Sequence, residues 1–204
     1  MSPSSRGPSS PTAVRSAFEL HLHLALAGSS PPTFAPDTTR SAIVRLHVLR
    51  GGPTVLLTWL ETQLGAPVAP VGRVERTFRY LERLERADLT HTRQSFALDP
   101  LATAAVLLRR RDELALAGWS GSNASEGDGL VEDLGRVETL EPDLPLGLSE
   151  RIDRVLDRLD EGTRLPPHRV VLHDPIDAWP PRWRPLLRRL ELVSADAPAP
   201  TAPE

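Results

Sequence analysis

Three histidines lie in segments that have the alternation of a β-strand. His21 and His23 alternate with leucines between Phe18 and Leu26, and His47 lies in a second such segment. Imidazoles on one strand face have the geometry for a metal site. Alternation with leucines, however, places these histidines on the polar face whether or not an ion binds, and no acidic residue follows at ligand spacing. The pattern favours a polar strand face, so we expect neither a metal ion nor another cofactor.

A second candidate for chemistry is the pair His173 and Asp174, which has the composition of half a Ser-His-Asp triad. No Gly-x-Ser-x-Gly elbow accompanies it. A His-Asp pair at the end of a strand is typical of a turn. A turn is therefore favoured over hydrolase chemistry.

All 24 basic residues are arginine, and the absence of lysine excludes several kinds of catalytic site. A Walker loop requires the lysine of G-x-x-x-x-G-K-[ST], and Schiff-base chemistry requires a primary amine. Pro142-Asp143 has the form of the first half of a PD-(D/E)XK nuclease motif, but the acid-x-Lys half cannot be built. Gly51-Gly52-Pro53 is typical of a tight turn before a helix rather than of a phosphate loop. We expect no catalytic residue on this chain.

The sharpest basic cluster is Arg109, Arg110 and Arg111, in a segment from Arg73 to Arg111 that has nine arginines and five acidic residues. Arginine makes bidentate contacts with phosphate, so these three residues are the candidate DNA-binding site and DNA is a candidate partner. Consecutive helical residues point to different sides, however, and Arg111 falls beside the apolar stripes. It is expected to pair with Asp112 or another acid. Solvated or structural roles are therefore favoured over phosphate binding.

Composition sets the broad class of the protein. The 204 residues, 40% of them hydrophobic, suffice for one well-buried domain. A formal net charge of -3 gives no global attraction to nucleic acid or to an anionic membrane. The chain has no cysteine, and its first apolar segment is too short for a signal or a membrane-spanning helix. We expect a cytoplasmic protein without membrane contact.

The distribution of proline, serine and apolar residues predicts one domain with loose ends. Residues 1–16 and 194–204 are rich in proline and small residues and lack an apolar period, which predicts disorder. Residues 17–193 are expected to form a single α/β domain with a flexible loop at 119–130. Residues 126–143 contain seven acidic residues and one arginine, which predicts a hinge or an exposed acidic arm.

Apolar periods predict strands and helices in alternation. Strands are expected at 18–26, 42–49 and 170–172. Five helices are expected, with apolar faces at Leu56, Trp59, Leu60 and Leu64; at Val74, Phe78, Leu81 and Leu84; at Leu101–Leu108 behind the N-cap Asp99; at Ile152, Val155, Leu156 and Leu159 behind the N-cap Ser149; and at Trp183, Leu186, Leu187 and Leu190. The helix behind Asp99 is expected to be the most buried. This order predicts a helix-rich, three-layer α/β fold around a small, mainly parallel sheet.

Four segments are similar to a known family. The run SFALDPLATAAVLLRRRDELALAGW, residues 95–119, resembles the SF-x-x-DP-x-x-TA…LL-x-x-RDEL-x-x-AGW segment near the N-terminus of large bacterial PD-(D/E)XK exonuclease proteins of the RecB/AddB type. Three other segments fall in the order that the family shows. They are GGPTVLLTWLETQLG, which resembles GP-x-x-LL-x-x-LE-x-x-LG; LPLGLSERIDRVLDRL, which resembles G-x-x-x-R-x-x-x-VL; and VVLHDPIDAWPPRWRPLLRRL, which resembles a strand-turn-helix with PP-x-W-x-x-LL-x-x-L. The resemblance spans about residues 48–190.

The resemblance implies a helicase-like region that serves a nuclease located far downstream in a longer protein. Proteins of this family process DNA ends in recombination and repair, and their nuclease residues have no counterpart here. We therefore expect a truncated or split relative: a non-catalytic, helicase-like N-terminal module that contacts DNA or a partner such as a helicase-nuclease subunit. The alternative is a stand-alone protein-interaction domain without nucleic-acid contact, in which Trp179, Trp183 and the acidic arm meet a partner chain.

Overall fold

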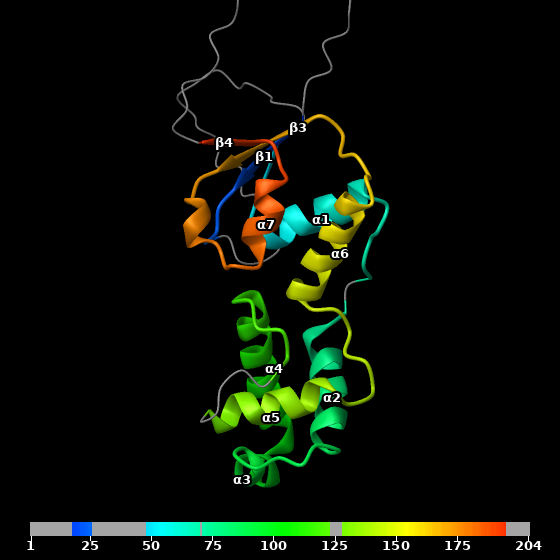
Figure 1. Ribbon diagram of the computed structural model, residues 1–204, viewed down its shortest axis with the longest axis vertical. Coiled ribbons are helices and arrows are strands. Elements are labelled where there is room, and N and C mark those ends of the chain that lie inside the picture. The colour runs from blue at the N-terminus through cyan, green and yellow to red at the C-terminus, as the bar shows by residue number, and fades with distance from the viewer. Residues whose placement is uncertain (1–17, 26–47, 70, 123–127, 195–204) are drawn as a thin grey trace, which may run out of the picture.

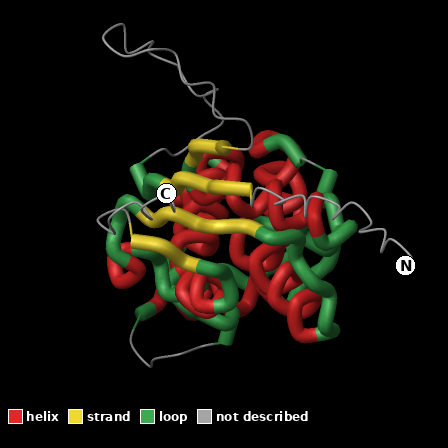
Figure 2. Tube along the Cα trace, turned by 90° about the horizontal axis from the view of Figure 1, so that it is seen from above, coloured by secondary structure: helices red, strands yellow, loops and turns green. Residues whose placement is uncertain are grey.

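The computed structural model describes residues 18–25, 48–69, 71–122 and 128–194. Their strands form one four-stranded sheet in the order β2-β1-β3-β4, and every neighbouring pair is parallel (Figures 1 and 2). The strands are β1 Phe18–Leu22, β2 Val48–Gly51, β3 His168–Leu172 and β4 Leu192–Ser194. Residues that follow β1 and β3 therefore meet at the same edge of the sheet.

The alternation along the strands gives the sheet an apolar face and a polar face. Leu20 and Leu22 of β1 are fully buried on the apolar face, together with Val170 of β3. Glu19 and His21 point to the opposite, polar face, because successive side chains of a strand alternate. The helices can therefore pack on the apolar face alone without burying these polar groups.

Three helices pack on the apolar face, below the sheet in Figure 1. They are α1 Pro53–Gln63, α6 Leu148–Asp160 and α7 Trp183–Arg188, with the short 3-10 turn η1 Ile176–Ala178 before α7. Their buried leucines, with Ile152 and Trp183, form one core with the strand leucines. Each fully buried side chain of this kind contributes about 1.5–3 kcal/mol. Pro53 suits the first helical position of α1, and Gly65 follows its end with a φ of 64° that favours glycine.

A second group of helices has its own core, in the lower half of Figure 1. It consists of α2 Arg73–Leu84, α3 Arg93–Leu98, α4 Pro100–Leu116 and α5 Gly129–Glu138. Tyr80 of α2 and Leu134 of α5 are fully buried there. Asp99 caps α4 as predicted, because its carboxylate accepts a hydrogen bond of 2.9 Å from the Ala102 amide.

The predicted fold class is confirmed. The protein is a helix-rich α/β protein with a small parallel sheet. In Figure 1, the sheet, the helices on its apolar face and the α2–α5 group follow one another as three layers. The predicted strands correspond to β1, β2 and β3, and β4 was not predicted. Residues 1–16, 42–47 and 195–204, for which disorder or a strand is predicted, lie outside the described residues. Ser194, the first residue of the predicted disordered tail, is instead the last residue of β4.

The predicted buried stripe of α2 is confirmed for Leu81 and Leu84, which pack in the second core, and wrong for its first half. Val74 and Phe78 are 69% and 50% exposed, respectively. The helix instead turns Arg76 and Arg83 inward, where Arg83 Nε donates to the Pro142 carbonyl at 2.6 Å. Buried guanidinium groups require acceptors, and these lie on the inner side of α2. The buried face of α2 therefore combines the apolar side chains of Tyr80 and Leu84 with arginines whose hydrogen-bond partners lie on that side.

Three further predictions about the second half of the chain are corrected. The described part of the predicted acidic arm, residues 128–143, is not an exposed arm, because α5 packs into the core and the Asp133 side chain is 1% exposed. The predicted loop at 119–130 ends earlier, because Asp128 caps α5. Ser149 is not an N-cap; Gly147 occupies that position and its amide donates to Glu150.

Helix α4 is also less enclosed than predicted. Leu101 and Val106 in its first half are 46% and 54% exposed. Helices α2 and α3 pack against α4, and these two side chains remain uncovered by them.

Among the helices that the structure describes, none is both long and apolar enough to cross a lipid bilayer.

Candidate functional site

Two of the three arginines of the candidate DNA-binding site lie on the outer surface of α4. The side chains of Arg109 and Arg110 are 65% and 56% exposed. Both approach Glu113, with N–O distances of 3.8 Å from Arg109 and 3.2 Å from Arg110. Exposed ion pairs of this kind contribute at most about 1 kcal/mol. Both guanidinium groups could therefore exchange Glu113 for a phosphate at little cost.

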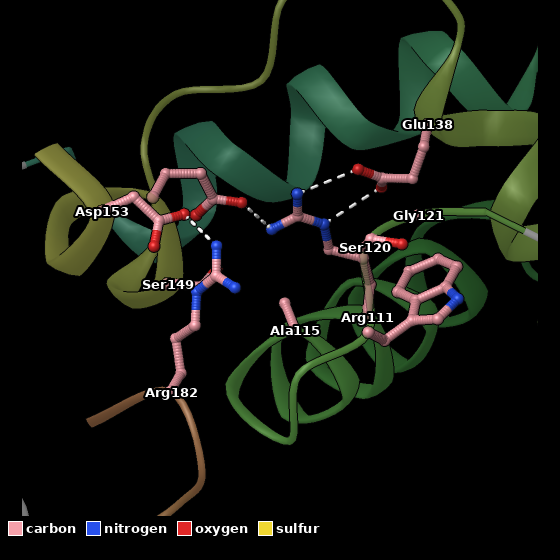
Figure 3. Close-up of a pocket in the computed structure, with 10 residues that line it drawn as sticks. Arg111, Ala115, Ser120, Gly121, Glu138, Ser149, Asp153 and Arg182 are labelled. Carbon is pink, nitrogen blue, oxygen red and sulfur yellow. Dashed lines mark hydrogen bonds and ion pairs between the residues drawn. The ribbon is translucent and has the colours of Figure 1, made fainter. Parts of the chain in front are cut away.

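The third arginine, Arg111, points the other way and is held by carboxylates (Figure 3). Its Nε and Nη2 donate to the two carboxylate oxygens of Glu138 at 3.0 and 2.9 Å. Its Nη1 pairs with Glu150 and, at 3.2 Å, with Asp112. The Arg111 side chain is only 10% exposed. The expected internal pairing with Asp112 is confirmed, and Arg111 is not available to a DNA phosphate in this arrangement.

Burial and charge act in opposite directions on this cluster. Burial by itself would lower the pKa of the Arg111 guanidinium, but the hydrogen bonds to Glu138 and the charge of Glu150 hold that pKa above its ordinary range. Burial would likewise raise the pKa of the Glu150 carboxyl, and the charge of Arg111 holds it below its ordinary range. Arg111 and Glu150 therefore both stay ionised at neutral pH, and their ion pair connects α4 to α6.

A small polar cavity of about 140 Å³ lies beside Arg111, where the two helix groups meet. Figure 3 shows Arg111 of α4 and Arg182, which precedes α7, both pointing into it. Arg182 pairs with Asp153 of α6, and this hydrogen bond raises the pKa of the Arg182 guanidinium. The Arg182 amide also donates to the Leu116 carbonyl at 3.0 Å. The cavity is thus part of the junction that holds the two cores together.

His21 lies on the polar face of β1 as predicted, His23 directly follows the strand, and His173, directly after β3, joins them. His21 Nδ1 lies 3.0 Å from His173 Nε2, and the His23 ring stacks on the His173 ring at a centroid distance of 3.9 Å. Partial burial and the neighbouring imidazoles lower the pKa of His173. His47, the third histidine considered from the sequence, lies outside the described residues. Among the described residues, no three metal-binding side chains already surround a common point.

The predicted turn at His173 and Asp174 is confirmed by their contacts. Asp174 Oδ2 accepts a hydrogen bond of 2.6 Å from the Leu24 amide, so this carboxylate ties the end of β1 to the end of β3. The carboxylate that contacts a histidine here is Glu19, whose Oε1 lies 2.6 Å from His21 Nε2. A hydrolase triad that orients His173 through Asp174 is therefore not supported by these contacts.

The tryptophans predicted to meet a partner chain are in the core. Trp179 is fully buried and Trp183 is 1% exposed, and the two rings pack edge to face at 5.7 Å. Their contact stabilises the layer on the sheet. A partner surface built on Trp179, Trp183 and an acidic arm is therefore ruled out in this conformation.

No family model, curated protein or solved structure matches this chain. The likeness to exonuclease proteins of the RecB/AddB type, including the helicase-like character of the fold, therefore stays a prediction.

Several residues of these clusters could not be found from the sequence. The position of Arg111 beside the apolar stripes of α4 indicated that it points inward, but its partners Glu138 and Glu150 come from other helices. The alternation of β1 indicated that Glu19 and His21 share a face. Only the parallel pairing of β1 with β3 brings His173 to them.

Proposed function

We propose that this chain is a non-catalytic, helicase-like N-terminal module of a PD-(D/E)XK exonuclease protein of the RecB/AddB type, which acts in the cytoplasm in DNA end processing, recombination and repair. The observation that supports this proposal is that the four segments similar to the family converge on one helix turn. That turn is the beginning of α6, which belongs to the third segment.

Three nearly consecutive residues of α6 each bind one of the other segments. Arg151 makes two hydrogen bonds of 2.7 Å with the Glu61 carboxylate of α1, in the first segment. Glu150 pairs with Arg111 of α4, and Asp153 pairs with Arg182 before α7. These contacts join α1, α4, α6 and the segment before α7 through paired charges. Their convergence supports a shared structural framework, and therefore a scaffolding role.

In this role, the contact with DNA is assigned to Arg109 and Arg110. They are the exposed members of the arginine cluster, and their acidic partner Glu113 is exposed as well. A phosphate can displace Glu113 because the ion pair is solvated on both sides. Arg111 serves the framework instead. The patch is small, so binding is expected to be weak, independent of sequence and strongly dependent on salt.

Fluorescence anisotropy with labelled single-stranded, duplex and tailed DNA at low salt tests this proposal. The double variant Arg109→Gln with Arg110→Gln should weaken binding and reduce the slope of log K against log salt by about 2 for duplex DNA. Glu113→Gln should strengthen binding, because it removes the competing carboxylate.

A control with the same change of charge separates a local patch from general electrostatics. Arg188 and Arg189, at the end of α7, are also exposed. Their double replacement by glutamine should leave the affinity for DNA nearly unchanged. An equal loss in both double variants would refute the patch, and no binding of the wild-type chain to any of the three DNA forms would refute the DNA contact altogether.

The alternative function is a protein-interaction domain. Because Trp179 and Trp183 are buried, its partner would have to bind another surface. The exposed apolar side chains of the second helix group include Val74 and Phe78, which lie one turn apart on α2. If DNA binding is absent, Val74→Ser with Phe78→Ser tests this alternative. The double variant should then lose a partner that co-purifies with the wild-type chain.

A further inference from the structure

We propose that His21 and His173 form a binding site for one divalent transition-metal ion that prefers imidazole ligands, such as Cu²⁺, Ni²⁺ or Zn²⁺. The two residues come from neighbouring parallel strands, with His21 near the end of β1 and His173 directly after β3. The chain adds β2 on one side of β1 and then adds β3 on the other side, so the order in which strands are added to the sheet switches at β1. Open α/β sheets commonly bind ligands near the carboxyl ends of their strands at such a point.

The distance between the two facing nitrogens suits a shared metal ion. His21 Nδ1 and His173 Nε2 are 3.0 Å apart. Two nitrogens that each lie about 2.05 Å from one ion are about 2.9 Å apart at right angles and about 3.3 Å apart at the tetrahedral angle. The observed spacing therefore fits neighbouring positions of a tetragonal Cu²⁺ or Ni²⁺ ion, and Zn²⁺ requires the rings to separate by roughly 0.3 Å.

Glu19 occupies the place of an outer carboxylate. Its Oε1 lies 2.6 Å from His21 Nε2, on the opposite side of the ring from His173. A metal-bound histidine almost always donates its second ring nitrogen to a carboxylate or carbonyl, which fixes the ring and makes the other nitrogen a better ligand. When His21 donates its Nε2–H to Glu19, its Nδ1 accepts the hydrogen bond that His173 Nε2 donates. A metal ion would take the place of the proton between the two rings, and His173 would then keep its proton on Nδ1.

The surroundings determine the class of ion and the strength of binding. The His173 side chain is exposed, so an ion can reach the site and keep water in its remaining positions. His23 stacks on His173 and is the nearest further imidazole. Two imidazoles without a direct carboxylate ligand disfavour Mg²⁺ and Ca²⁺, which prefer oxygen. Arg50 pairs in register with His21 on the polar face, and its charge opposes a cation.

Isothermal titration of the purified chain with CuCl₂, ZnCl₂, NiCl₂ and MgCl₂ tests the site. We expect one Cu²⁺, Ni²⁺ or Zn²⁺ per chain, with Cu²⁺ bound most tightly, and no measurable heat with Mg²⁺. His173→Gln should abolish this binding, and Glu19→Gln should weaken it by roughly 10–100-fold. Arg50→Gln should strengthen it a few-fold. In electron paramagnetic resonance, bound Cu²⁺ should show coupling to imidazole nitrogens that is altered in His173→Gln.

His91→Ala is the matched control, because His91 is exposed in the second helix group, away from the sheet. It should bind the metal ions as the wild-type chain does. Circular dichroism of each variant separates loss of a ligand from loss of the fold, and exposed His173 can be replaced without disturbing the core. Equal binding by wild type and His173→Gln, or a larger loss in His91→Ala, would overturn the proposal and indicate an adventitious surface ion.

Discussion

The replacement Arg111→Met tests whether the buried arginine serves the framework rather than DNA. Methionine retains much of the aliphatic volume on α4 and removes the charge. Glu138 and Glu150 then lose their cationic partner while they remain largely enclosed, with side chains 17% and 29% exposed. If Arg111 links α4, α5 and α6, Arg111→Met should lose a large part of the protein's stability.

The expected magnitude follows from the burial of the group. Removal of one partner from a buried ion pair costs about 3–5 kcal/mol, because the other charge is left without compensation. The carboxylates here retain some contact with water, so we expect the lower end, about 3 kcal/mol. For a domain of this size, that corresponds to a fall in Tm of roughly 6–12 °C. Arg109→Met and Arg110→Met, on the exposed side of α4, should each cost less than about 1 kcal/mol.

Urea unfolding followed by circular dichroism measures these differences. The difference in the free energy of unfolding between wild type and Arg111→Met should be largest at neutral pH. It should narrow as the pH falls below the ordinary carboxyl range near 4, because the folded-state pKa of Glu150 is lowered and its stabilisation is lost on protonation. Adding Glu138→Gln and Glu150→Gln to Arg111→Met should recover much of the loss, since no unpaired charge then remains. Arg111 does not link the three helices if Arg111→Met is as stable as Arg109→Met, or if the triple variant is less stable than Arg111→Met.

Two further predictions concern the framework. Gly51→Ala should destabilise the protein by about 1–3 kcal/mol, because a Cβ atom at Gly51 would lie 2.6 Å from Val55 Cβ. Gly72→Ala is the control and should unfold as wild type does, because a Cβ atom there meets nothing within 4 Å. Similar thermal melts of the two variants would contradict this prediction. Asp133→Asn should cost about 2–3 kcal/mol at pH 7, since an amide cannot accept all of the hydrogen bonds that Thr90 and Thr92 donate to the carboxylate. Burial would raise the pKa of Asp133, but these hydrogen bonds lower it. The stabilisation by the Asp133 carboxylate is therefore complete above the ordinary carboxyl pKa and disappears as the pH falls through the lowered pKa. Urea unfolding at several pH values should show the stabilities of wild type and Asp133→Asn converging in acid, and a constant difference down to pH 2 would count against this prediction.

The sequence was sufficient for those elements whose signals are local. Pro53 and Gly65 mark the two ends of α1, and Asp99 marks the start of α4, because caps and backbone angles depend on a few adjacent residues. The alternation of Leu20 and Leu22 with Glu19 and His21 determined the two faces of β1. The absence of lysine determined which catalytic sites the chain cannot contain.

Only the tertiary structure decided which residues share a site. The apolar stripe predicted on α2 is inward only at Leu81 and Leu84. In the first half of the helix, Val74 and Phe78 are exposed and Arg76 turns inward to its distant acceptors. Periodicity does not contain the positions of those acceptors, because they belong to segments far along the chain.

The two clusters that carry our proposals show the same division. The sequence placed Arg111 on the inner side of its helix and Glu19 beside His21 on one strand face. The partners Glu138, Glu150 and His173 became apparent only when helices and strands were packed, because an ion pair or a metal site requires groups within a few ångströms and sequence separation says nothing about that distance.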